Sequence, residues 1–322
     1  MLESEMPKGI ELATVKIQEN VPLAEHSNYR IGGPARFFCE AANEEDIRGA
    51  VLFVRAQSAP LFVMGGGTNL LIADEGFKGL VLKPALMELG VDGQTMTVGA
   101  GMMVSDMLKF TIERSLSGLE WAGGLPGTVG GAIRGNAGAF RGEIKDRIVS
   151  VESFDVETLE TIQRGNAECK FGYRASVFKE RNGREIILRA TLNLDKGDAQ
   201  KIAAGIQEKI NYRLERHPME YPNIGSTFKN VDLETVPKIW REAFAKVIKV
   251  DPFPVVPTAF LISEAGLRGT QHGGAMVSPK HPNFIVNLGG ATAADVKFLI
   301  AAVKEKVYDR YAIRLEEEIQ LV

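Results

Sequence analysis

The segment Val63–Ile72, VMGGGTNLLI, places three successive glycines directly after a short apolar run typical of a strand. Successive glycines let backbone N–H groups converge on an anion and leave room for a phosphate to approach. Thr68 and Asn69 add side-chain donors beside them. A tight turn at a strand end explains a lone glycine triplet equally well. The segment is neither a Rossmann fingerprint nor a P-loop, because no G-x-G-x-x-G opens a helix here and no Gly-Lys pair occurs in the chain.

A second segment, Gly118–Phe140 (GLEWAGGLPGTVGGAIRGNAGAF), is denser still in small residues. Glycine and alanine bury little apolar area, and glycine at such density carries an entropic cost on folding. This composition makes sense where the backbone lies against a flat or extended ligand, and Asn136 is a candidate amide for a ring carbonyl or nitrogen. The alternative is a glycine-rich loop that packs on itself.

Composition restricts the class of protein. The 322 residues suffice for about two domains, and 45% hydrophobic with 25% charged residues is typical of a globular protein. Basic and acidic side chains nearly balance, 38 against 41, with no basic stripe, so we expect a small-molecule partner and no nucleic acid. No signal-peptide pattern occurs, and no apolar run approaches the roughly 18–20 residues of a membrane helix, so we expect a cytoplasmic protein without membrane contact.

Cysteines and histidines follow no metal-binding pattern. Cys39 and Cys169 lie far apart, which favours free thiols over a disulfide or a thiolate metal site. His217, His272 and His281 have neither H-x-x-x-H nor H-E-x-x-H spacing, so we predict no metal.

Short strands and helices alternate in the first part of the chain. A strand is predicted over Ala35–Ala41, followed by a helix with Asn43 as N-cap and acidic residues in its first turn. Strand patterns then dominate up to about residue 194, interrupted by a helix around Val104–Ser115. This organisation favours an α+β or α/β nucleotide-binding layer.

The pattern changes near residues 196–200, where we place a domain boundary. Apolar residues step by four along Ile202–Leu214, which predicts a helix ending at about Arg216. Another helix is predicted after Thr292, and residues 314–322 are strand-like.

With these segments in place, the chain resembles the UDP-N-acetylenolpyruvoylglucosamine reductase (MurB) family, which binds FAD through the vanillyl-alcohol-oxidase (PCMH) type of fold. Several motifs carry the resemblance together, in family order and with plausible spacing. Besides the two glycine segments, they are HSNYRIGGPA (His26–Ala35), FGYRASVF (Phe171–Phe178), GSTFKN (Gly225–Asn230), AFLISEAGLRG (Ala259–Gly269), VSPKHPNFIVN (Val277–Asn287) and LEEEI (Leu315–Ile319).

The resemblance implies an α+β fold with a two-subdomain FAD-binding module over residues 20–197, divided into 20–80 and 81–197. A smaller α/β substrate domain would follow over 198–305, and a C-terminal segment, 306–322, would return to the active site. We expect a monomer.

The implied reaction is NADPH-dependent reduction of UDP-N-acetyl-3-O-(1-carboxyvinyl)glucosamine to UDP-N-acetylmuramate, in peptidoglycan precursor synthesis. Hydride would pass from NADPH through FAD to C3 of the enolpyruvyl ether, with a proton added at C2. By motif match, Arg174 would stabilise the enolate-like intermediate, Ser226 would donate the proton, and Glu318 would be the third catalytic group. Tyr173 and Asn230 match substrate-contacting positions. The chemistry suits this set, since a guanidinium opposes negative charge that builds on the carboxylate.

The resemblance also assigns the FAD diphosphate to the glycine triplet and the flavin to the later glycine segment. The implied cofactor-binding residues are Gly65, Gly66, Gly67, Thr68, Asn69, Leu70, Pro126, Gly127, Thr128, Gly130, Gly131 and Asn136. FAD oxidoreductases of this fold often tether FAD through a histidine or cysteine near the diphosphate loop. Because Leu61–Ile72 has neither, we predict non-covalent FAD.

The sequence departs from the family pattern in two places. Residues 231–258 are longer than the short proline-bearing link expected, and Val231 stands where proline is usual, which predicts an added helix near the substrate domain. No room follows FGYR for the long tyrosine-bearing lid loop of one subtype. The chain therefore resembles the shorter subtype, in which some other group must cover the substrate.

Three other functions stay open on sequence alone. Another FAD oxidoreductase of this fold could act on an alcohol or sugar. An acyl-serine hydrolase is suggested by S-x-x-K at Ser176–Lys179 and Ser226–Lys229, although no K-T-G accompanies them. The third is a non-catalytic nucleotide-binding module. A visible spectrum separates the flavoproteins from the other two, because only a flavoprotein is yellow.

Overall fold

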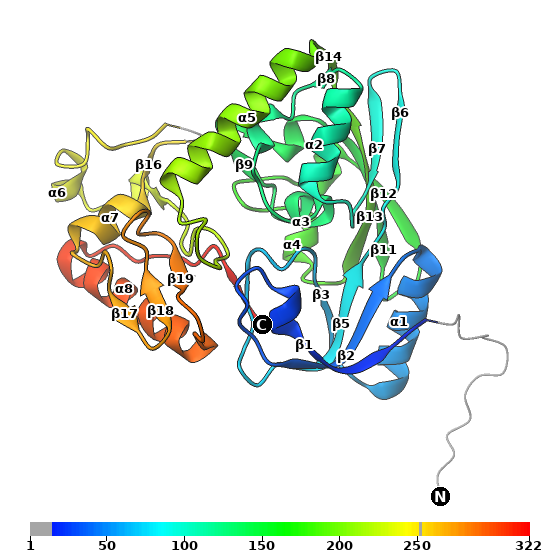
Figure 1. Ribbon diagram of the computed structural model, residues 1–322, viewed down its shortest axis with the longest axis horizontal. Helices are drawn as coiled ribbons and strands as arrows, with labels where there is room; N and C mark the ends of the chain where they lie inside the picture. Colours follow the sequence, from blue (N-terminus) through cyan, green and yellow to red (C-terminus); the bar gives the residue numbers. More distant parts are fainter. Residues whose placement is uncertain (1–14, 251–252) are drawn as a thin grey trace, which may run out of the picture.

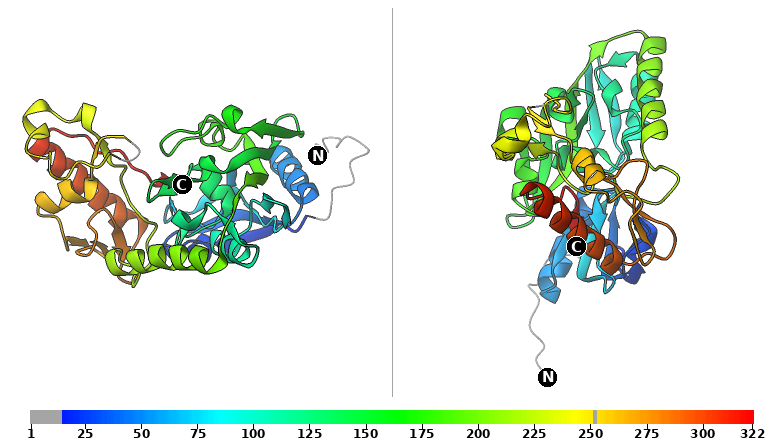
Figure 2. Two further views of the ribbon diagram at one scale, coloured as in Figure 1. Left: turned by 90° about the horizontal axis from the view of Figure 1, so that it is seen from above. Right: turned by 90° about the vertical axis from the view of Figure 1, so that its left-hand side faces the viewer.

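The computed structural model describes residues 15–250 and 253–322. Figures 1 and 2 show a larger body, built from the chain up to about residue 217, with the segment from there to α8 gathered at one side of it. The C-terminal residues then run back to the larger body (Figure 1).

The first sheet of the larger body has the order β1-β2-β5-β3, with β2 parallel to β5 and β5 parallel to β3. Its elements are β1 (Gln18–Pro22), β2 (Pro34–Ala41), α1 (Glu44–Gln57), β3 (Leu61–Val63) and β5 (Phe77–Pro84). Alternate residues of β5 face opposite sides, as a strand requires. Leu80 packs with Ile47 of α1, whereas Val81 packs with Phe38 on the other side. The predicted cap is confirmed, since Asn43 Oδ1 accepts a hydrogen bond from the N–H of Asp46 at 2.9 Å.

The second sheet is antiparallel throughout, in the order β12-β11-β13-β7-β6. Its strands are β6 (Leu89–Asp92), β7 (Thr95–Gly99), β11 (Ile148–Asp155), β12 (Thr161–Gly165) and β13 (Glu185–Asn193). Successive side chains of β13 point to opposite faces of the second sheet, so this strand contributes to two cores. Ile186 and Leu188 pack in the α1 cluster, whereas Ile187 faces a second core on the opposite side. That core is covered by α2 (Val104–Glu113), α3 (Val129–Arg134), α4 (Val177–Glu180) and α5 (Ala199–Arg216).

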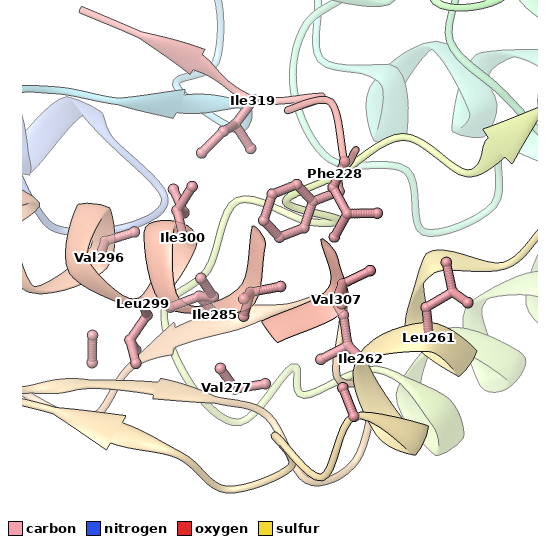
Figure 3. Packing of buried hydrophobic residues seen from close by; sticks show 14 of the residues in the cluster. Phe228, Leu261, Ile262, Val277, Ile285, Val296, Leu299, Ile300, Val307 and Ile319 are labelled. Carbon is pink, nitrogen blue, oxygen red and sulfur yellow. The ribbon is translucent and has the colours of Figure 1, made fainter. Parts of the chain in front are cut away.

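The smaller body surrounds the antiparallel sheet β17-β18-β19. Its main elements are α7 (Thr258–Glu264), β17 (Gln271–His272), β18 (Ala275–Val277), β19 (Ile285–Asn287) and α8 (Ala293–Tyr311). Figure 3 shows Ile262 of α7, Ile285 of β19 and Leu299 of α8 directed into one interior, where they are buried. Helix α8 begins after Thr292, as the sequence predicts, and a capping box joins Thr292 and Asp295.

Short elements complete the chain: η1 (Leu23–His26), β4 (Leu70–Leu71), β8 (Leu116–Ser117), η2 (Glu120–Ala122), β9 (Gly138–Ala139), β10 (Gly142–Glu143), η3 (Ile144–Asp146), η4 (Asn166–Cys169), β14 (Asp195–Lys196), β15 (Val231–Asp232), η5 (Leu233–Thr235), α6 (Lys238–Arg241), β16 (Val255–Val256) and β20 (Gln320–Leu321). The helix predicted in the insertion is present as η5 and α6, each a single turn.

The packing differs from the predicted boundaries at several points. Helix α5 buries Ile202 and Ile206 in the second-sheet core, so the division after residue 197 separates the helix from the core on which it packs. Residue 306 lies inside α8, residue 80 lies inside β5, and only β20 of the strand-like C-terminus is a strand. Periodicity shows which face of a helix is buried but not which core receives it.

Several side-chain hydrogen bonds join the two bodies. Tyr29, 1% exposed, donates its hydroxyl to the Ile285 carbonyl at 2.8 Å, and Asn287 Nδ2 donates to the Tyr29 carbonyl at 3.0 Å. Asp74, which follows β4, accepts hydrogen bonds from the N–H groups of Ala293 and Ala294 at 2.7 and 3.0 Å, in the first turn of α8. The bodies are therefore linked by hydrogen bonds as well as by the shared core that includes Tyr29.

We predict that Tyr29→Phe destabilises the protein, because it leaves the buried Ile285 carbonyl without its donor. A buried unsatisfied polar group costs about 1–3 kcal/mol. Urea denaturation should report a loss of that size in the free energy of unfolding, whereas Tyr308→Phe, at a side chain 44% exposed, should change little. Equal denaturation midpoints for Tyr29→Phe and the wild type would contradict this role.

Candidate active site

One cleft of about 380 Å³ brings most of the predicted site residues together. It is lined by Gly65, Gly66, Gly67, Thr68, Asn69, Leu70, Pro126, Gly127, Thr128, Gly131, Tyr173, Arg174, Ser226, Asn230 and Glu318. Gly130 lines a neighbouring cavity of about 310 Å³. The two spaces share Val63, Gly65, Thr128, Gly131, Arg134 and Gln320, so together they form an extended site.

The two glycine segments meet backbone to backbone. A Cβ on Gly66 would lie 2.7 Å from the Gly127 Cα, and one on Gly65 would lie 2.7 Å from Thr128 Oγ1. Gly67 has φ +62°, a conformation that favours glycine, and a Cβ there would collide with the His26 carbonyl. Glycine is thus required by the mutual approach of the segments, and that approach leaves bare backbone along the cleft wall.

Basic side chains surround this wall. Arg134, Arg174, Lys179 and Arg213 all line the cleft. Burial, followed by the charges of Lys229 and Arg134, lowers the pKa of Lys179, and burial lowers the pKa of Arg134. An anionic ligand would relieve the repulsion among these groups. Bare backbone and crowded cations together fit the phosphates of a dinucleotide such as FAD.

Arg174 projects from a tight turn. Its φ is +53°, and the flanking Gly172 and Ala175 exchange backbone hydrogen bonds of 3.0 and 3.2 Å. Its Nε donates to Glu318 Oε1 at 2.6 Å, and its Nη2 donates to the Gly138 carbonyl at 3.0 Å. Burial opposes the charge of Arg174, but the attraction and hydrogen bond of Glu318 outweigh it and raise the arginine pKa. The guanidinium is therefore held as a fixed cation.

Asn136 differs from its predicted role as a flavin contact. It is fully buried and lines neither space. Its Nδ2 donates to the Gly172 carbonyl at 2.9 Å and to Glu143 Oε1 at 3.2 Å, and its Oδ1 accepts from the Lys145 N–H at 3.3 Å. These bonds use both ends of the amide, so Asn136 supports the turn that carries Arg174.

Ser226 and Glu318 come from two segments that pair antiparallel. The Glu318 N–H donates to the Thr227 carbonyl at 2.8 Å, and the Lys229 N–H donates to the Glu316 carbonyl at 2.9 Å. Asn69 Nδ2 donates to the Glu318 carbonyl at 3.1 Å. Backbone pairing thus brings Ser226 and Glu318 to one cleft, and the side-chain hydrogen bond of Arg174 to Glu318 adds the third predicted residue.

Tyr173 and Asn230 line the same cleft. Burial, and then the charge of Glu318, raises the pKa of Tyr173. The Tyr173 ring meets the Phe253 ring edge to face, with centroids 5.1 Å apart. Asn230 Oδ1 accepts a hydrogen bond from the Thr258 N–H at 3.2 Å.

The sequence analysis missed Arg134, Lys179, Arg213 and His217 as lining residues. Arg213 Nε donates to the Gly123 carbonyl at 2.9 Å, while its buried Nη2 has no protein partner among the described residues. Burial, and then the charge of His281, lowers the pKa of His217 to about 4, so this imidazole is neutral at pH 7. A signal was present for Arg213, because it continues the buried face of α5 at helical spacing, and His217 is the residue that caps the end of this helix.

Comparison with known proteins identifies the family. Residues 35–158 match the family model of an FAD binding domain, and residues 217–322 match that of the UDP-N-acetylenolpyruvoylglucosamine reductase C-terminal domain. A protein of that name from Carboxydothermus hydrogenoformans is 37% identical over 100% of this chain and 98% of its own. The chain belongs to the UDP-N-acetylenolpyruvoylglucosamine reductase family.

Other members of this reductase family agree. The Anoxybacillus flavithermus protein of the same name is 39% identical, covering 95% of this chain and 94% of its own. The crystal structure of the Thermus caldophilus reductase (MurB) aligns with a TM-score of 0.74 at 30% identity, covering 95% of this chain and 98% of the other. The predicted fold class, an FAD-binding module followed by a smaller domain of this family, is confirmed.

The described residues lack what a metal site and a membrane-spanning helix require. Across 15–250 and 253–322, no three His, Cys, Asp or Glu side chains are grouped so as to hold a metal ion. None of the helices in those ranges is both long and apolar enough to cross a membrane.

We predict that Gly66→Val weakens FAD binding, because the new side chain would push the Gly127 backbone away and open the cradle. Overpacking costs about 1–3 kcal/mol, so the FAD dissociation constant should rise about tenfold or more. The measurement is the flavin-to-protein ratio after gel filtration. Gly90→Ala, where a Cβ has open space, is the control. Full FAD retention by Gly66→Val would contradict the cradle.

Proposed function

We propose that this protein is an FAD-dependent, NADPH-linked reductase of UDP-N-acetyl-3-O-(1-carboxyvinyl)glucosamine, forming UDP-N-acetylmuramate. One observation carries the proposal. The motif residues Arg174, Ser226 and Glu318 line a single cleft with the glycine cradle, in a chain that aligns end to end with reductases of this name.

The cradle is the candidate FAD site. Gly65–Asn69 and Pro126–Thr128 offer bare backbone to the diphosphate, with Arg134 and Lys179 as nearby cations. FAD bound there would supply hydride transfer between NADPH and substrate, which no side chain of the chain can perform. The described part of Leu61–Ile72 contains no histidine or cysteine, which supports non-covalent binding.

Arg174 would stabilise the charge that develops during reduction. Addition of hydride at C3 leaves electron density on C2 and on the attached carboxylate. A guanidinium already fixed by Glu318 and the Gly138 carbonyl can oppose that charge without reorganising. The contribution of Glu318 in this arrangement is to orient the arginine.

Ser226 would deliver the proton to C2. Its segment is held against Glu316–Glu318 by backbone hydrogen bonds, so the backbone that carries this half-buried serine has a fixed position in the cleft. A weak acid positioned on one face of the carbanion protonates that face selectively.

An acyl-serine hydrolase fits this geometry poorly. Ser176 is buried and donates its hydroxyl to the Arg134 carbonyl at 2.7 Å. Lys179 Nζ donates to the Arg174 carbonyl, and Lys229 Nζ pairs with Glu316 at 3.0 Å. Both lysines of the S-x-x-K strings are therefore engaged elsewhere.

The remaining parts of the proposal concern setting and partners. The reaction belongs to peptidoglycan precursor synthesis, and we place the enzyme in the cytoplasm as a monomer that binds the UDP-sugar and NADPH but not nucleic acid. A net charge of −3 supports the last point.

We predict that the purified protein is yellow and releases intact FAD on acid denaturation. Anaerobic NADPH should bleach the flavin, and the enol ether should restore its colour. Colourless protein that cannot be reconstituted, or flavin that stays attached to the chain, would contradict the cofactor assignment. Reduced flavin that the enol ether fails to reoxidise would point to another FAD oxidoreductase.

Ser226→Ala separates the two half-reactions. Because proton donation follows flavin reduction, bleaching by NADPH should keep nearly its wild-type rate, whereas reoxidation by the enol ether should slow by about 10²–10⁴-fold. Stopped-flow absorbance measures both steps. Ser226→Cys should recover part of the rate, and Ser105→Ala, at an exposed serine, should change neither step. Loss of FAD, or equal slowing of both steps, would show that Ser226 is structural.

A further inference from the structure

The inserted segment, residues 231–257, starts and ends beside the cleft. Its first strand, β15, follows Asn230 directly and pairs antiparallel with β16, with Val231 opposite Val256. Next to this pair, Thr258 donates its N–H to Asn230 Oδ1 at 3.2 Å and its hydroxyl to the Lys229 carbonyl at 2.5 Å. The base of the insertion is therefore continuous with a residue that lines the cleft.

Aromatic packing fixes the body of the insertion to the smaller body. Trp240 and Phe244 contact Tyr311 of α8, with ring centroids 5.1 and 5.5 Å apart, and Phe244 also meets Phe260 of α7 at 5.5 Å. Edge-to-face pairs of this kind are favourable beyond the area they bury. The Trp240–Phe244 part of the insertion is thus packed against the smaller body, and these two rings have fixed positions there.

The insertion reaches the larger body through Phe253. This half-buried ring meets Tyr173 edge to face, at 5.1 Å and an interplanar angle of 85°. The neighbouring backbone is tied down, because the Leu233 N–H donates to the Pro254 carbonyl at 3.0 Å and the Val255 N–H donates to the Lys249 carbonyl at 2.8 Å. Phe253 does not line the cleft itself, whereas Tyr173 does.

Tyr173 lines the cleft directly beside the catalytic candidate Arg174. It precedes Arg174 in the tight turn, and the Arg174 Cζ lies 5.3 Å from the centre of the Tyr173 ring. A shift of this ring would change both a wall of the cleft and the surroundings of the guanidinium.

We propose that Phe253 is a positioning residue that holds Tyr173 in its substrate-binding orientation. The insertion thereby supports, from the second half of the chain, the tyrosine that lines the cleft. The ligand held in this way is the enolpyruvyl end of the nucleotide sugar, beside Arg174 and Ser226. This inference rests on the proposed function.

Binding of the enol ether to the oxidised enzyme, followed through the flavin absorbance, tests the proposal. An aromatic pair contributes enough for Phe253→Ala to raise the Kd of the enol ether about 2- to 10-fold. Flavin reduction by NADPH should stay within about twofold of wild type, because that step does not use the enolpyruvyl contact. Phe253→Tyr keeps the ring and should restore the wild-type Kd. Ile239→Ala, at a side chain of the same segment that is 79% exposed, is the matched control and should leave the Kd unchanged.

A double-mutant cycle decides whether Phe253 acts through Tyr173. In a Tyr173→Ala background, Phe253→Ala should raise the Kd no further, because its target is already gone. An equal penalty in both backgrounds would overturn the proposal, and so would an unchanged Kd in the single variant. Failure of the wild-type reduced flavin to react with the enol ether would instead refute the proposed function, which keeps the two failures distinct.

Discussion

Glu318 is the residue on which the arrangement of the cleft depends. Its carboxylate fixes Arg174, its N–H binds the Thr227 carbonyl, and its carbonyl accepts from Asn69. Three separate parts of the chain are thus joined at one amino acid. The Arg174 and Glu318 side chains are only 23% and 20% exposed, so loss of either would leave a largely desolvated charge unpaired, which is costly.

Much of the fold could be predicted from the sequence, because local signals determine it. Asn43 and Thr292 begin helices through side-chain capping, and β13 alternates between two cores as its apolar pattern requires. The placement of α5 could not be predicted, since an apolar stripe does not specify its partner. The fold class itself came from the family resemblance and agrees with the matched family models.

Sequence motifs predicted some residues of the candidate site and missed others, because a motif does not show which side chains surround a residue in the fold. Motif order identified Arg174, Ser226 and Glu318, and the cleft contains all three. Asn136 is instead bonded within the protein, because an amide can bond a ligand ring or a backbone carbonyl, and only the buried surroundings show which one it meets. Arg213 and His217 were overlooked, since the place of one on α5 and of the other at its C-cap matters only once the cleft beside the helix is known. The contact of Phe253 with Tyr173 joins residues 80 positions apart, and no local sequence pattern predicts such a contact.

The capping of α8 by Asp74 has a consequence for how this architecture can be recombined. The helix belongs to the second half of the chain, yet the carboxylate that accepts its first N–H groups comes from the first half. Tyr29 and Leu71 likewise complete a core made mostly of later residues. A chimera that joins the first half of one relative to the second half of another would need compatible residues at each of these places. A fragment that contains only the residues matched by the C-terminal family model would therefore lack part of its own interior.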